Sequence, residues 1–187
     1  MTLKDTGART TFETGSQKEI VTGRGRYDLM PLKQLSNVYD RMSREVKDSE
    51  KYESIAEFLY QIYNSLIIKS IPSKVFYIIS AITIFSKEIL NRELPEITQA
   101  LAKLYEAGAQ KYSERDWEKG RPQEVFINSA LRHFFQYLNG ETDEDHATAA
   151  VWNLLSCADT IERLPEMAYT INNSQKWNKL VYNEYEI

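Results

Sequence analysis

The chain has 187 residues, of which 42% are hydrophobic and 27% are charged, as is usual for a globular protein with one core. Its formal net charge is −4. Non-specific binding of nucleic acid requires a basic surface that displaces counterions, so this charge argues against nucleic acid as the main partner. An acidic protein is better suited to a small phosphorylated ligand held through a metal ion. We treat residues 1–187 as a single domain.

Cysteine content and hydropathy bear on the compartment. Cys157 is the only cysteine and lies in an apolar helical stretch, so we expect a buried, inert thiol and no disulfide within the chain. The first fifteen residues lack the apolar segment of a signal peptide. The most apolar run, VFYIISAITIF at residues 75–85, is shorter than the roughly 20 residues that span a bilayer. We expect a cytoplasmic protein with no membrane partner.

The first half of the chain predicts an arm and three helices. Residues 1–30 are polar and show neither helical nor strand periodicity, so we expect an extended N-terminal arm. Pro31 suits the first turn of a helix, and apolar residues then recur at helical spacing. The clearest stripe covers residues 55–67, and its helix is expected to end at Pro72. Ser73 is predicted to cap the third helix, whose apolar run would lie inside the protein or at a subunit interface.

The second half predicts two helices on either side of a charged loop. Pro95 opens the first of these helices. The loop KYSERDWEKGRP, rich in charges of both signs, follows at residues 111–122. The next helix begins at Pro122 and is closed by Asn139-Gly140.

A sixth helix precedes the C-terminal tail. The stretch Thr142-Asp-Glu-Asp145 resembles a capping box with Asp in place of the usual Glu, and the helix that it opens runs to Pro165. Residues 166–187 alternate weakly between apolar and polar, so this tail packs on a neighbouring subunit or remains mobile. Six helical stretches with short connections predict an all-α helical bundle.

Polar residues occupy positions in the fifth and sixth helices where core residues are expected. His133 falls on an apolar stripe beside Arg132. His146 and Asn153 are about two helical turns apart, so they share a face. Two facing helices with such residues would form a polar pocket of the kind that holds metals and cofactors in bundles. The alternative is that each histidine is an ordinary core or surface residue.

Glu141, Asp143, Glu144 and Asp145 form an acidic cluster at the start of the sixth helix. The positive end of the helix dipole favours acidic residues there, which is one explanation. The other is that one or two of them bind Mg²⁺, which prefers carboxylate oxygens together with substrate phosphates. Glu106, on the polar side of the fourth helix, is by itself typical of a solvated face.

The loop at residues 111–122 offers cations for phosphates and Trp117 as a stacking surface for a base. Its cations are Lys111, Arg115, Lys119 and Arg121. Acidic residues alternate with them, and alternating charges are usually solvated. The sequence contains no Walker A, HExxH, paired CxxC or GxSxG motif, so nucleophilic serine or cysteine catalysis is not expected.

Four stretches together resemble one known family. They are KDTGARTTFETG, TGRGRYDLMP, LYEAGAQKYSERDWEKGRP and SALRHFFQYLNGETDEDHATAAVWNLL. The chain is similar to a phage-encoded family described as dATP/dGTP diphosphohydrolase, N-terminal domain, over residues 4–33 and 96–164. By this resemblance residues 40–94 are a helical insertion, and residues 166–187 are unmatched. A phage-encoded protein would act in the cytoplasm of the bacterial host cell.

The resemblance implies an all-α, MazG-like nucleotide pyrophosphohydrolase that uses Mg²⁺ or Mn²⁺ and releases pyrophosphate. Together with the residue patterns, it predicts three groups of site residues. The catalytic group is His133, Arg132 and Lys111; the metal-binding group is Glu106, Glu141, Asp145 and His146; the substrate-binding group is Arg26, Tyr112, Arg115, Trp117, Lys119 and Asn153. The MazG pattern places Glu-Glu-x-x-Glu on one helix and Glu-x-x-Asp on the next, where this chain carries Arg132-His133 and His146-x-x-Ala149.

We expect metal-dependent hydrolysis of dATP or dGTP to the monophosphate and pyrophosphate. The alternative is a binding protein that sequesters a nucleotide or a nucleotide-derived immune signal without cutting it, as a phage counter-defence protein would. The missing carboxylates favour sequestration, whereas the retained acids and histidines favour hydrolysis. A third hypothesis is a scaffold built on the apolar insertion. We also expect a homo-oligomer, a dimer or tetramer, because a bundle of this size has little room to cover the run at residues 75–85.

Overall fold

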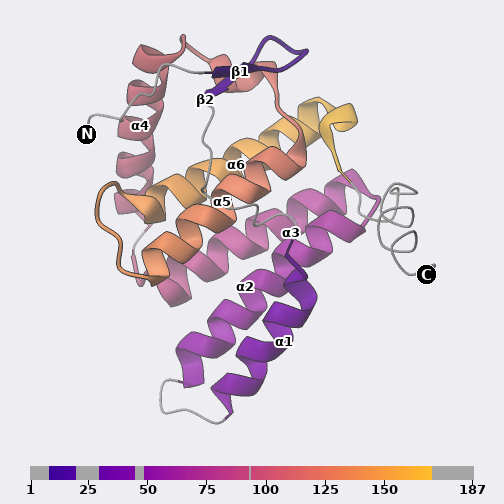
Figure 1. Cartoon of the computed structure of the whole chain (residues 1–187), viewed down its shortest axis with the longest axis vertical. Coiled ribbons are helices and arrows are strands. Elements are labelled where there is room, and N and C mark those ends of the chain that lie inside the picture. Colours follow the sequence, from indigo (N-terminus) through magenta and orange to yellow (C-terminus); the bar gives the residue numbers. More distant parts are fainter. Residues whose placement is uncertain (1–8, 20–29, 45–48, 93, 170–187) are drawn as a thin grey trace, which may run out of the picture.

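The computed structural model describes residues 9–19, 30–44, 49–92 and 94–169 (Figure 1). Within these ranges the chain forms an all-α helical bundle with one short β-hairpin, which confirms the predicted fold class. The helices are α1 (Leu32–Ser43), α2 (Ser49–Ile67), α3 (Ile71–Ile84), α4 (Leu94–Lys111), α5 (Gln123–Leu138) and α6 (His146–Arg163). The shorter elements are the strands β1 (Arg9–Thr11) and β2 (Gln17–Glu19), the π-helical turn η2 (Phe85–Ile89), and the 3-10 turns η3 (Asp116–Lys119) and η4 (Pro165–Met167).

The hydrophobic core lies where α2, α3, α5 and α6 meet. Its centre holds three fully buried rings, because aromatic side chains bury the largest apolar area per residue. Phe58 of α2 stacks on Phe134 of α5 with 4.1 Å between ring centroids, and Phe85 meets Phe134 edge-on at 5.2 Å. Helix α1 packs on α2, and α4 stands against α6 (Figure 1). Helices α2 and α3, within the expected insertion at residues 40–94, thus share one core with α5 and α6.

Two helices begin at residues other than those predicted. The N-cap of α3 is Ser70 and not Ser73, because Pro72 is accommodated in the first helical turn, where a missing N–H is tolerated. The N-cap of α6 is Asp145, whose carboxylate accepts a hydrogen bond from the Thr148 backbone N–H at 3.0 Å. The capping box expected to start at Thr142 is therefore wrong, since the helix starts three residues later than that motif requires.

Residues 9–19 form an antiparallel hairpin in which Arg9 pairs with Glu19 and Thr11 with Gln17. Gly15 occupies the turn with a φ of +79°. The sequence shows no strand periodicity here, because strands of three residues are too short to show alternation. Residues 20–29 of the expected arm, and the tail from residue 170 onward, lie outside the described residues.

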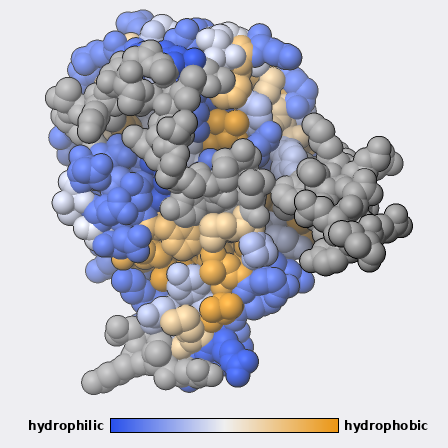
Figure 2. Space-filling model, viewed as in Figure 1, coloured by the Kyte–Doolittle hydropathy of each residue, from blue (hydrophilic) through white to orange (hydrophobic). Residues whose placement is uncertain are grey.

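Helix α3 is apolar on its outer face as well as its inner face. Ile78 is fully buried, whereas the side chains of Phe76 and Ile79 are 65% and 43% exposed. Figure 2 shows an apolar area on this side of the molecule, over α2 and α3. The run at residues 75–85 is therefore buried on one face only. Among the described helices, none joins the length and the apolarity that crossing a bilayer demands.

Candidate functional site

Two buried histidines meet between α5 and α6. The short turn at Gly140, which has a φ of +75°, makes these helices antiparallel neighbours. His133 is 6% exposed and His146 is 2% exposed, and their Nδ1 atoms are 3.1 Å apart. The structure thus brings together two residues that the sequence placed on facing helices. Their catalytic and metal-binding roles stay predictions.

The carboxylate of Glu144 completes a triangle with the two imidazoles. Its Oε1 atom lies 3.2 Å from His133 Nδ1 and 3.3 Å from His146 Nδ1. We call these three side chains the histidine cluster. Glu144 is partly exposed whereas both rings are buried, so the cluster is reached from the side of the carboxylate.

The neighbours of the two rings determine where their protons lie. An arginine nitrogen can only donate, so His133 Nε2, at 2.9 Å from Arg132 Nη2, must accept. A neutral His133 ring therefore carries its proton on Nδ1, which faces His146 and Glu144. His146 Nε2 lies 2.8 Å from the Asp143 carboxylate, which accepts, so His146 Nδ1 is left as an acceptor. A continuous chain of hydrogen bonds runs from Arg132 through both rings to Asp143.

An open hollow of about 540 Å³ lies beside the histidine cluster. Its rim is acidic and is made by the turn before α6. The lining residues are Leu90, Arg92, Tyr137, Glu141, Thr142, Asp143, Glu144, Asp145, His146 and Ala147. The acidic cluster read from the sequence therefore faces a space that could hold an ion and a ligand.

Asp145, one of the predicted metal ligands, is already engaged as a helix cap. Its two carboxylate oxygens accept hydrogen bonds from the N–H and the hydroxyl of Thr148, at 3.0 and 2.7 Å. Arg92 Nη1 lies 4.0 Å from Asp145 Oδ2. Capping and the helix dipole are therefore sufficient to explain why an acidic residue occupies position 145. The metal-binding role of Asp145 remains a prediction.

A second hollow, of about 360 Å³, lies between α4 and the first turn of α6. Arg92 and Asp145 line both hollows, so the two spaces adjoin across this ion pair. The other lining residues are Glu96, Gln99, Ala100, Lys103, Leu104, Ala107 and Thr148. Sequence reasoning missed Arg92, which lies in the connector before α4 and shows no motif. The only local signal is the neighbouring Asn91, whose positive φ of +50° marks a sharp change of chain direction.

Comparison with known proteins identifies this part of the chain. Residues 86–169 match the family described as dATP/dGTP diphosphohydrolase, N-terminal. This segment is similar to that family. No curated protein and no solved structure shows a significant match. The matched segment contains α4, α5 and α6, and with them both hollows and the histidine cluster.

Within the matched segment, the predicted substrate loop does not line either hollow. Trp117 instead packs against Tyr105, with ring centroids 5.6 Å apart, and Arg163 covers its ring at 5.8 Å. The Arg115 side chain pairs with Glu118, and Arg9 lies over the ring of Tyr112. Figure 1 shows this loop beyond the C-terminal end of α4, whereas the α5–α6 turn lies near its other end.

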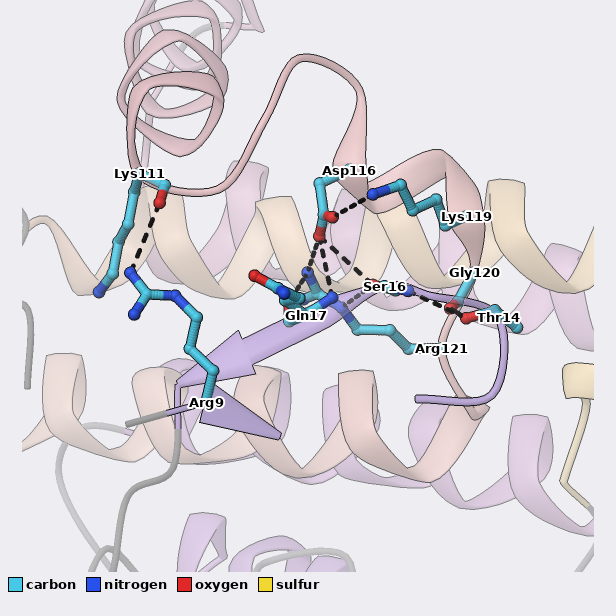
Figure 3. A network of polar contacts seen from close by, with 9 residues as sticks. All are labelled: Arg9, Thr14, Ser16, Gln17, Lys111, Asp116, Lys119, Gly120 and Arg121. Carbon is cyan, nitrogen blue, oxygen red and sulfur yellow. Dashed lines mark hydrogen bonds and ion pairs between the residues drawn. The ribbon is translucent and has the colours of Figure 1, made fainter. Parts of the chain in front are cut away.

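The cations of this loop take part in a network that fastens the hairpin (Figure 3). Arg121, 6% exposed, donates to the Ser16 hydroxyl at 2.7 Å and to the Asp116 carboxylate at 3.2 Å. Lys119 donates to the other Asp116 oxygen at 3.0 Å. Burial raises the pKa of Asp116, but the hydrogen bonds from Lys119 and the Gln17 N–H outweigh it and hold that pKa below its ordinary value. We call these four side chains, together with the Gln17 backbone, the hairpin lock.

The remaining predicted residues lie apart from the histidine cluster. Glu106 is exposed on α4 and lines neither hollow. The amide of Asn153 is buried and donates to the Ala149 carbonyl at 2.8 Å, which is a bond within α6. Lys111 lies at the last residue of α4, where its carbonyl accepts from Arg9. Arg26 falls outside the described residues.

Proposed function

We propose that the protein cleaves a purine deoxynucleoside triphosphate, dATP or dGTP, to the monophosphate and pyrophosphate with the help of a divalent cation. The observation that carries the proposal is the pair of adjoining hollows inside the segment that matches the diphosphohydrolase family. One hollow has the carboxylates that a cation needs. The other has the size of a small-ligand site, since such sites start at about 300 Å³.

The lining of the hollows suggests how a nucleotide would lie. Ala100, Leu104 and Ala107 give the hollow between α4 and α6 an apolar wall for a base. Arg92 reaches both hollows and would contact the phosphates, and Lys103 adds a second cation on α4. The negative charge of a triphosphate would then face the acidic rim, so a cation between rim and phosphates is required to offset the repulsion.

The residues present fit a divalent cation. Glu141, Asp143 and His146 each bring one donor atom to within 4.8 Å of the others, and so do His133, Glu144 and His146. Of the expected ions, Mn²⁺ accepts both imidazole nitrogen and carboxylate oxygen, whereas Mg²⁺ strongly prefers oxygen. When bound, such an ion polarises a phosphoryl oxygen and lowers the pKa of a coordinated water. The role of His133 as a general base, and that of Lys111 in catalysis, remain expectations.

Sequestration without cleavage is the second candidate function. Its support is that the carboxylates beside the hollow come from the turn before α6 and not from the facing surfaces of α5 and α6. One of them, Asp145, is engaged in capping. A site with fewer rigidly held carboxylates would bind a nucleotide or a nucleotide-derived immune signal and leave it intact.

A panel of nucleoside triphosphates tests both functions. Purified protein is incubated with each nucleotide and either Mg²⁺ or Mn²⁺, the products are separated by chromatography, and binding is measured by calorimetry. Cleavage predicts monophosphate and pyrophosphate from dATP or dGTP, lost in Arg92→Gln and retained in the loop variant Arg115→Gln. Binding without products, again lost in Arg92→Gln, would establish sequestration. Neither binding nor products would refute both and leave the scaffold hypothesis.

We further propose that the protein is a homo-oligomer, a dimer or tetramer. The support is the exposure of Phe76 and Ile79 on the outer face of α3, together with Tyr60 on α2 at 43%. Light scattering should give a mass above 21.8 kDa, the mass of one chain. The double variant Phe76→Ser, Ile79→Ser should give the mass of a single chain. A monomeric parent protein would contradict this proposal.

A further inference from the structure

We propose that His133 Nδ1, His146 Nδ1 and Glu144 Oε1 together bind one transition-metal ion of the class of Zn²⁺, Co²⁺ or Mn²⁺, in preference to Mg²⁺. This inference deepens the proposed function, because it names the ligands and the chemical class of its cation. The binding of the ion itself does not depend on any nucleotide.

The geometry of the three donor atoms is already that of a metal site. The triangle has sides of 3.1, 3.2 and 3.3 Å. Metal–nitrogen and metal–oxygen bonds to zinc are about 2.1 Å long, so an ion bonded to all three atoms would lie about 1 Å outside their plane. The angles at that ion would be about 95° to 104°, between the values for an octahedron and a tetrahedron.

The identity of the donors determines the class of ion. Two of the three atoms are imidazole nitrogens, which suit zinc, cobalt and manganese, whereas Mg²⁺ takes oxygen ligands and keeps several waters. Both rings are buried, and Glu144 faces the hollow, so protein covers one side of the ion and the other side stays open. An ion held by three protein ligands with an open side is the arrangement found in catalytic metal sites.

The groups behind the two rings act in opposite directions. His146 Nε2 donates to Asp143, which is the contact that orients metal-binding histidines in many proteins. His133 Nε2 instead accepts from Arg132, which keeps the proton of that ring on Nδ1, where the ion would bind. When the ion takes Nδ1, the ring proton shifts to Nε2, and Arg132 must then turn away because two donors would face each other. Gln136, which already accepts from Arg132 at 3.0 Å, can hold the displaced guanidinium.

Co²⁺ binding to the full chain, without nucleotide, tests the site. Protein freed of metal with a chelator is titrated with Co²⁺ while the visible absorption of nitrogen-ligated cobalt is recorded, and Zn²⁺ affinity is then measured by competition. We expect one ion per chain, displaced by Zn²⁺ and not by an excess of Mg²⁺. Glu144→Gln and His133→Asn should each weaken binding at least tenfold, with helical content checked by circular dichroism.

Glu162→Gln is the matched control, because it removes the same charge at an exposed position of α6 that lines neither hollow. Its affinity for Co²⁺ should equal that of the parent protein. Equal losses in Glu162→Gln and Glu144→Gln, or displacement by Mg²⁺, would show that only the overall negative charge attracts the ion and would overturn the proposal. Ion binding without nucleotide turnover would refute the hydrolase function and leave the metal site standing, so the two failures are distinguishable.

Discussion

The hairpin lock and the histidine cluster are both buried groups of polar side chains, yet their charges are arranged differently. In the hairpin lock, Asp116 and Arg121 are 5% and 6% exposed and each faces a group of opposite charge. In the histidine cluster, three atoms able to bind a cation converge within 3.3 Å. Burial of polar groups is common to both. What separates the structural network from the candidate binding site is that oppositely charged groups pair in the first, whereas donor atoms able to bind a cation converge in the second.

This difference also argues against the charged loop as a phosphate site. Lys119 and Arg121 already bind the Asp116 carboxylate, and Arg115 binds Glu118. A phosphate would have to displace these partners. Among the described residues, the carboxylates that contact Arg92, the cation lining both hollows, lie farther away, at 3.9 and 4.0 Å.

The largest expected effect comes from breaking the hairpin lock. Arg121→Met leaves Asp116 buried with part of its charge uncompensated, so the free energy of unfolding should fall by about 3–5 kcal/mol in urea denaturation. Arg115→Met, which removes a cation from the same loop at an exposed position, should leave that free energy unchanged. Equal effects of the two substitutions would mean that the lock does not hold the loop.

Each of the two regions has a glycine with positive φ nearby, and substituting these glycines compares how tightly the two backbones are packed. A Cβ atom on Gly120, next to the hairpin lock, would lie 2.5 Å from Leu164 Cδ1, whereas one on Gly140, beside the histidine cluster, would meet nothing within 4 Å. Gly120→Ala should therefore lower the free energy of unfolding by about 2 kcal/mol, and Gly140→Ala by about 1 kcal/mol from backbone strain alone. Thermal unfolding of both variants measures the difference, and the opposite ranking would contradict it.

Lys74 is a third buried charge, and carbonyl groups rather than a carboxylate surround it. Its Nζ donates to the carbonyls of Ser65 and Tyr169 at 2.7 and 2.5 Å, and burial lowers its pKa to about 8. Between about pH 8 and pH 10.5, Lys74 is therefore mostly protonated in the unfolded chain and mostly neutral in the folded protein. Stability from this group should rise with pH across that window, by about 1.4 kcal/mol per pH unit at most.

Lys74→Met removes this titration, so the pH dependence of unfolding should differ between parent and variant above pH 8. The exposed Lys69→Met serves as the control and should follow the parent protein. Identical pH profiles for the parent and Lys74→Met would show that the buried amine does not titrate in this range.

The smallest expected effect is a change in Co²⁺ affinity on substituting Arg132, and it tests the assignment of the metal ligands. Arg132→Met removes the donor that keeps the His133 proton on Nδ1, so the affinity for Co²⁺ should increase about fivefold, as expected for the loss of one competing hydrogen bond of about 1 kcal/mol. Spectroscopic titration measures it. Weaker binding in this variant would mean that Arg132 supports the ion instead of competing with it.

Local patterns in the sequence were sufficient for the helices and for part of the site. A helical stripe depends on residues three or four positions apart, so the existence of all six helices was predicted correctly. His133 and His146 were placed on facing helices because a short turn between two helices leaves them antiparallel. The N-caps at Ser70 and Asp145 were missed because several polar residues precede each helix, and the sequence does not say at which of them the helix begins.

The sequence by itself therefore determined which segments are helices and which polar residues share a helix face. Only the tertiary structure decided which charges are balanced. Ser16 lies 100 residues before Asp116, and Lys74 donates to a carbonyl 95 residues away. A cation in a loop looks the same in the sequence whether it is available to a phosphate or already paired with a carboxylate. The difference depends on contacts between residues far apart in the chain, and these form only when the whole core is assembled.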